Sequence, residues 1–305
     1  IDKIIGRIYP VFAFALIFMA LALMVCLFVK WPSLPELWDG LGNLGESKGL
    51  LSGQPIFPCL FITIACGAVS GFHATQSPMM ARCLTDERLG RPVFYGAMIT
   101  EGIVALIWAT VSSWFFFDGG AAEVGATVSA AAPDVVVKVS KGWLGILGGI
   151  LAILGVVAAP ITSGDTAFRS ARLIVADFLH LNQKPIANRL MISIPLFLIA
   201  GVLLWYNIAD ENGFNVIWRY FGWANQTLAV FMLWTATAYL VKFKKGLTYL
   251  ITMIPAAFMT AVCTTYICVA KIGLGLPNSW NSAIGLATFV VSLVVFYTLY
   301  FRRRK

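Results

Sequence analysis

An all-helical membrane protein that crosses the bilayer several times is the fold this sequence predicts, on three observations. Hydrophobic residues make up 59% of the 305 residues and charged residues only 12%, about half of the roughly 25% in an ordinary soluble domain. Apolar stretches of about 17 to 25 residues, long enough for a helix to cross a bilayer, recur along the chain. They lack the alternating pattern of a transmembrane β-barrel. We therefore expect a polytopic α-helical protein in a lipid bilayer.

Eight spans are predicted, and residues 1–305 are expected to form a single transmembrane domain. If the loops alternate sides, fourteen of the 22 Lys and Arg residues fall on one side of the membrane and five on the other. Because basic loops stay in the cytoplasm, both termini are predicted to be cytoplasmic. The predicted spans are residues 8–29, 56–78, 93–117, 142–175, 190–206, 217–241, 249–269 and 282–301.

Charge and motifs exclude several classes of function. The net charge of +8 follows from the basic inner loops, so we expect no nucleic-acid partner. The chain has no CxxC pair, HExxH, P-loop or GxSxG motif, which argues against a resident metal, a cofactor and an enzymatic activity. The first residues, IDKIIGR, contain no initiator Met, and we expect helices to precede them in the native protein.

The second span changes from apolar to polar residues about halfway along its length. Residues 56–69 are mostly apolar and about 21 Å long as a helix, which is too short to cross the bilayer. The polar residues that follow, 70–78, must then lie at membrane depth and predict a discontinuous helix. Lipid cannot satisfy freed backbone groups, so such a break must line a cavity or pack on protein. The alternative is a Pro-kinked helix that ends near Gln76. The candidate solute ligands here are Ser70, Gly71, His73 and Gln76.

The third span carries Glu101, eight residues into an apolar sequence. A carboxylate at membrane depth is costly and commonly marks an ion or proton pathway. A protonated, hydrogen-bonded structural Glu explains the residue equally well. Glu101 is therefore a candidate for H⁺ coupling, with the structural role left open.

The fourth span ends in LGVVAAPITSGDTAFRSARLIVADF, where Pro160 and Gly164 flank a group of oxygen-bearing side chains. Thr162, Ser163 and Asp165 offer the all-oxygen surroundings that a hard cation such as Na⁺ prefers. Asp165 and Arg169 also stand four residues apart, so an ion pair on the helix surface accounts for them without transport.

The sixth span opens with IWRYFGWANQTLAVFMLW, and its Asn225 and Gln226 lie about one and a half turns below the outer edge. Asn225 is a candidate solute ligand, although amides at this depth more commonly join neighbouring helices.

Three blocks of sequence, in the same order, resemble the carbon starvation protein A family of bacterial inner-membrane transporters. They are FITIACGAVSGFHATQSPMMARC, SGDTAFRSARLIVADF and IWRYFGWANQTLA. The resemblance implies a LeuT-like inverted-repeat architecture, of which this chain would be the second half. It also implies uptake of peptides or pyruvate when carbon is scarce, with a coupling cation.

The function expected from residues and resemblance together is secondary active nutrient uptake at the bacterial inner membrane. Peptide import coupled to H⁺ or Na⁺ is the first expectation, and a pyruvate/H⁺ symporter is the alternative. An alternative from another class is a membrane sensor or scaffold that reports starvation without moving solute. The expected partners are a small-molecule solute and the lipid bilayer, and the sequence leaves the oligomeric state open.

Overall fold

The computed structural model describes residues 2–50, 53–128, 132–210, 213–244 and 246–300, and every long element within these ranges is a helix. Six of the described helices are long and apolar enough to cross a bilayer. The chain is therefore a multi-pass membrane protein. Those six include neither the interrupted second span nor the sixth predicted span, so the count of eight, the inverted repeat and the single domain stay predictions.

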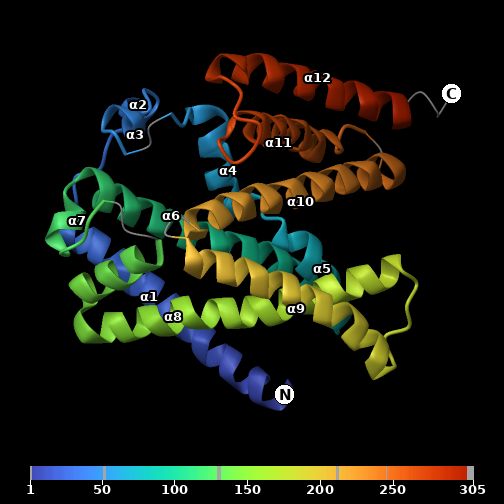
Figure 1. Cartoon of the computed structure of the whole chain (residues 1–305), viewed down its shortest axis with the longest axis horizontal. Helices are drawn as coiled ribbons and strands as arrows, with labels where there is room; N and C mark the ends of the chain where they lie inside the picture. The colour runs from blue at the N-terminus through green and yellow to red at the C-terminus, as the bar shows by residue number, and fades with distance from the viewer. Residues whose placement is uncertain (1, 51–52, 129–131, 211–212, 245, 301–305) are drawn as a thin grey trace. The chain divides into compact units, whose positions relative to one another are not determined.

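The chain divides into two compact units, one of residues 1–50 and 95–170 and one of residues 51–94 and 171–305 (Figure 1). The first unit contains α1 (Asp2–Lys30), α2 (Leu37–Gly40), α3 (Leu44–Ser47), α6 (Gly96–Phe117), α7 (Gly120–Glu123) and most of α8 (Ala132–Phe178). The second contains α4 (Ile56–Ala68), α5 (Phe72–Cys83), the end of α8, α9 (Ile186–Ala209), α10 (Gly213–Phe243), α11 (Leu250–Val269) and α12 (Asn281–Tyr300).

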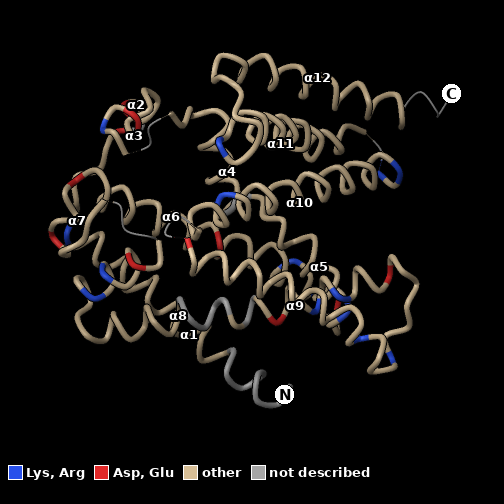
Figure 2. The backbone as a smooth tube through the Cα atoms, viewed as in Figure 1, with Lys and Arg blue, Asp and Glu red and all other residues tan. Residues whose placement is uncertain are grey.

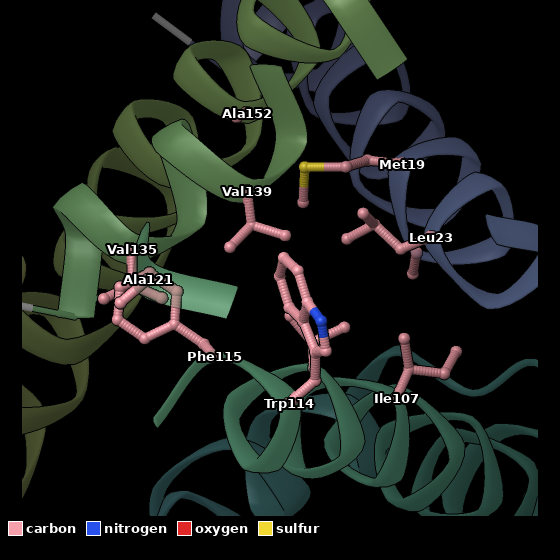
Figure 3. Close-up of a cluster of buried hydrophobic side chains, with 11 residues drawn as sticks. Met19, Leu23, Ile107, Trp114, Phe115, Ala121, Val135, Val139 and Ala152 are labelled. Atoms are coloured by element: carbon pink, nitrogen blue, oxygen red, sulfur yellow. The ribbon is translucent and has the colours of Figure 1, made fainter. Parts of the chain in front are cut away.

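The first unit is built around the aromatic side chains of α6. Phe115 is fully buried and Trp114 is nearly so, and both belong to a cluster with Met19 and Leu23 of α1 and Val139 of α8 (Figure 3). Removing one large apolar side chain from water stabilises a fold by about 1.5–3 kcal/mol. Close packing of these side chains thus holds α1, α6 and α8 together.

The second unit is built around α11, which packs against α10, α12 and α4. Neither α11 nor α12 contains a charged residue, and Figure 2 shows blue and red mainly at helix ends and in loops. Small and apolar residues of α11, including Ala256, Ala257 and Val262, are fully buried. Small buried residues allow helices to approach closely, which is how helices pack where lipid removes the hydrophobic driving force.

Polar side chains join α10 to α11 along their length. The indole Nε1 of Trp223 donates a hydrogen bond of 3.1 Å to the carbonyl of Cys263. Farther along, Trp234 donates to the hydroxyl of Thr260 at 3.0 Å, and Thr237 donates to the hydroxyl of Thr252 at 2.8 Å. Interhelical bonds of this kind each contribute about 0.6 kcal/mol in a membrane protein. They fix the register of α10, which carries part of the candidate site.

The connections before the second and before the fourth predicted span contain short helices. These are α2, α3 and α7, and α8 begins at residue 132. The helix that contains the predicted fourth span, residues 142–175, thus begins ten residues before that span. Within α8, Gly145 has φ 66° and ψ −152°, a region in which only glycine avoids strain. The helix therefore changes direction at Gly145.

Candidate functional site

The predicted interruption of the second span is present, between α4 and α5. At Val69, where α4 ends, the backbone has φ −143° and ψ 83°, far from helical values. Helical geometry resumes at Gly71, and α5 begins at Phe72. With thirteen residues, α4 is about 20 Å long, which is shorter than the roughly 30 Å hydrocarbon core of a bilayer.

The extent of the irregular segment differs from the prediction. We expected irregular backbone across residues 70–78, but His73, Gln76 and Pro78 all lie inside the regular helix α5. The hydroxyl of Thr75 donates a hydrogen bond of 3.0 Å to the carbonyl of Phe72 within the first turn of this helix. The alternative, a helix that ends near Gln76, is also wrong, because α5 continues to Cys83.

The break packs directly against α10, and the two segments meet at predicted site residues. The hydroxyl of Ser70 and the side-chain amide of Asn225 approach to 3.4 Å, a long hydrogen bond between residues 155 positions apart. Both side chains are 4% exposed. A Cβ at Gly71 would lie 2.7 Å from Cβ of Leu228 and 2.9 Å from Oδ1 of Asn225. Only a residue without a side chain therefore allows this approach.

Two further polar contacts shape the start of α5. The hydroxyl of Ser70 accepts a hydrogen bond of 3.3 Å from the backbone N–H of Phe72. The ring Nδ1 of His73 lies 2.8 Å from the carbonyl of Ser70, which implies that Nδ1 carries the proton. The side chain of Gln76 is half-buried one turn farther along. The next two N–H groups of α5 are also bonded, that of His73 to the carbonyl of Ser70 and that of Ala74 to the carbonyl of Gly71. What the start of this helix offers a solute is therefore the partial positive charge of a helix N-terminus.

Gln226, the other member of the amide pair that the sequence shows, is fully buried next to Asn225. One contact at this site was missed by sequence reasoning. The ring of Phe72 lies 6.0 Å from the ring of Phe221 on α10. No local pattern pairs two aromatic residues so distant in sequence, so only the tertiary structure identifies this contact.

The candidate ion-coupling residues belong to the first unit. Glu101 lies on α6 and is exposed, not enclosed among helices. Asp165 lies on α8, 3.4 Å from Arg169, and both side chains are more than 40% exposed. This is the surface ion pair that the spacing predicts.

The side chains of Thr162 and Ser163 lie outside the described residues, although the helix continues past Pro160 and Gly164. Among the described residues no three His, Cys, Asp or Glu side chains gather as metal ligands.

Comparison with known proteins links these features to bacterial transporters. The peptide transporter CstA of Escherichia coli is 28% identical over 296 residues, which cover 76% of this chain and 41% of that protein. The pyruvate/proton symporter BtsT of the same organism is 27% identical over 323 residues, covering 78% and 43%. An uncharacterized protein of Haemophilus influenzae is 47% identical over 129 residues, covering 42% of this chain and 88% of its own length.

The chain thus spans about two fifths of the length of the two Escherichia coli relatives. No solved structure matches it significantly. The model of the family described as carbon starvation protein CstA matches residues 9–143 and 121–266, well over half of the chain. The chain therefore belongs to the carbon starvation protein CstA family.

Proposed function

We propose that this chain forms part of a secondary active transporter that takes up small nutrients across the bacterial inner membrane. Peptides imported in the response to carbon starvation are the proposed solutes. The observation that carries the proposal is the break between α4 and α5, which meets α10 through Ser70, Gly71 and Asn225.

The physical reason is the cost of irregular backbone in lipid. Each unsatisfied N–H or C=O group in the hydrocarbon layer costs several kcal/mol, so a break survives only where protein or a watery cavity covers it. Transporters use such breaks because the ends of the half-helices can contact an ion or a solute. Here the buried amide of Asn225 on α10 covers the break, and an amide can both donate hydrogen bonds to and accept them from the peptide groups of a solute.

Pyruvate is the second candidate solute, and the relative named as a pyruvate/proton symporter favours it. A peptide and pyruvate share a carboxylate and a carbonyl group. The partial positive charge at the start of α5 suits either solute, since it attracts both groups.

Coupling to H⁺ or Na⁺ is proposed to involve Glu101, Thr162 and Ser163. A carboxylate at membrane depth can bind a proton, and hydroxyl oxygens suit Na⁺. Asp165 is the weaker candidate, because its ion pair with Arg169 already explains its charge. Replacing Glu101 with Gln keeps the shape and removes the titratable group. We expect Glu101→Gln to abolish uptake driven by a pH gradient while leaving solute binding intact.

Uptake by membrane vesicles that contain the native full-length protein tests the proposal. Labelled dialanine and labelled pyruvate are offered separately, with a pH gradient, a Na⁺ gradient or none. We expect gradient-driven accumulation of dialanine, and a loss of about tenfold or more in the Ser70→Ala and Asn225→Ala variants, since each removes the polar contact between the break and α10. Thr235→Val is the matched control, because Thr235 is exposed on the same helix as Asn225.

Three outcomes would contradict parts of this proposal. Accumulation of pyruvate alone would replace the proposed solute. Unaltered uptake in both site variants would remove the site. Absence of uptake with every gradient, together with a stable protein partner recovered from membranes, would favour the sensor or scaffold.

A further inference from the structure

A cavity of about 750 Å³ lies in the first unit, between α1, α6 and the segment that follows α1. This volume is within the range of cavities that hold small molecules in proteins. Most of its walls are apolar, and they include Leu27 and Phe28 of α1 and Ile103 and Leu106 of α6. None of the described residues that line it belongs to the candidate site at the helix break.

The segment that closes one side of the cavity turns sharply at Trp31. This residue follows the end of α1 and has φ 43°, in the left-handed region that a bulky residue rarely adopts. The residues after it, from Pro32 to Glu36, contribute to the lining. The ring of Trp31 lies 6.3 Å from that of Phe28. Strained residues of this kind are commonly found at ligand sites.

Glu36 is the one charged residue among the described residues that line the cavity. It takes part in neither of the two ion pairs found among the described residues. The other polar lining residues, Ser33 and Thr110, carry hydroxyl groups. A carboxylate without a counter-charge from the protein favours a cationic ligand.

The setting of the cavity indicates what kind of cation this is. Both α1 and α6 are long and apolar enough to cross a bilayer. Phe28 is 67% exposed and Leu106 is 69% exposed, so these walls are open to the hydrocarbon around the helices. Glu36 lies six residues beyond the last residue of α1, and charged and aromatic residues just past a membrane span lie at the level of the headgroups. The cavity therefore has an apolar side that faces lipid and an anionic end.

We propose that this cavity binds a phospholipid with an ammonium headgroup, of the phosphatidylethanolamine class. The ammonium group lies at the carboxylate of Glu36, and an acyl chain lies against Leu27, Ile103 and Leu106. Trp31 favours the same headgroup, because a cation is attracted to the face of an indole ring. An anionic phospholipid such as phosphatidylglycerol is repelled by Glu36. The inference is independent of which solute the protein moves.

The test measures lipid retained by the purified native full-length protein in detergent. Labelled phosphatidylethanolamine and labelled phosphatidylglycerol with identical acyl chains are offered together, and bound lipid is counted after gel filtration. We expect the wild-type protein to retain about fivefold more phosphatidylethanolamine, the preference that one exposed ion pair supplies. Glu36→Gln is expected to remove the preference, and Glu36→Asp, which keeps the carboxylate, is expected to retain it.

Glu46→Gln is the matched control, because Glu46 is an exposed acid of the same connection that does not line the cavity. It should leave the preference unchanged. A second arm adds free ethanolamine, which has the ammonium group but no acyl chain, and we expect it not to displace the lipid. Displacement by free ethanolamine would show that the site binds a soluble amine, and would overturn the lipid assignment. Equal retention of both lipids by the wild-type protein, or a full preference in Glu36→Gln, would overturn the inference while the proposed transport function stands.

Discussion

Replacing Gly71 with Ala tests how closely the helix break must approach α10. Gly71 has φ −64° and ψ −18°, which any residue adopts, so the substitution changes contacts and leaves the local backbone preference intact. The new Cβ would lie 2.7 Å from Cβ of Leu228, and the backbone oxygen of Asn225 is closer still. Ordinary contact begins at 3.4 Å. The segments must therefore separate by at least 0.7 Å, the difference between 3.4 and 2.7 Å.

That separation would break the polar contact at the site. The hydroxyl of Ser70 and the amide of Asn225 are already 3.4 Å apart, and a further 0.7 Å gives 4.1 Å, which is beyond a hydrogen bond. Overpacking costs about 1–3 kcal/mol and the lost bond about 1 kcal/mol. We expect Gly71→Ala to lower the free energy of unfolding by about 2–4 kcal/mol and to abolish dialanine uptake.

The assay is denaturant-induced unfolding in detergent, followed by tryptophan fluorescence. Gly222→Ala is the matched control on α10, because its Cβ would lie 3.6 Å from Ile62, an ordinary contact. Ala also favours a helix over Gly by about 1 kcal/mol, so this control should be neutral or stabilising. Equal stability of Gly71→Ala and the wild-type protein would refute the reasoning, since the close approach would then not exist.

Two further substitutions test the packing of each unit. Phe115→Ala should destabilise the first unit by about 3–5 kcal/mol, because Phe115 is fully buried. The control Phe14→Ala should destabilise it by less than about 1 kcal/mol, because Phe14 is 70% exposed. A similar loss in both variants, measured in the same unfolding assay, would show that the cluster around α6 is not the core. Thr237→Val should lower the free energy of unfolding by about 1 kcal/mol, because it removes the buried 2.8 Å bond to Thr252. Thr235→Val, on the exposed face of the same helix, should be neutral. If Thr237→Val is neutral as well, that bond does not stabilise the second unit.

Most of the helices and the interruption of the second span could be predicted from composition and local pattern. A helix is made by bonds between residues four apart, so the residues of each segment largely decide whether it forms. The short apolar run that ends at Val69, followed by polar residues, was sufficient to predict the break. Its extent was not predictable from pattern, because the residues from His73 to Pro78 suit either a loop or the first turns of a helix.

The sequence by itself determined a membrane protein with an interrupted second span and proposed Ser70, Gly71 and Asn225 as separate candidates. Only the tertiary structure decided that these three residues meet, that the ring of Phe72 lies beside that of Phe221, and that Glu101 is exposed. The physical reason is distance along the chain. Contacts between residues 155 positions apart depend on which helix faces pack together. Many packings are compatible with the same apolar segments. The local pattern therefore does not select the packing that places Asn225 against Gly71.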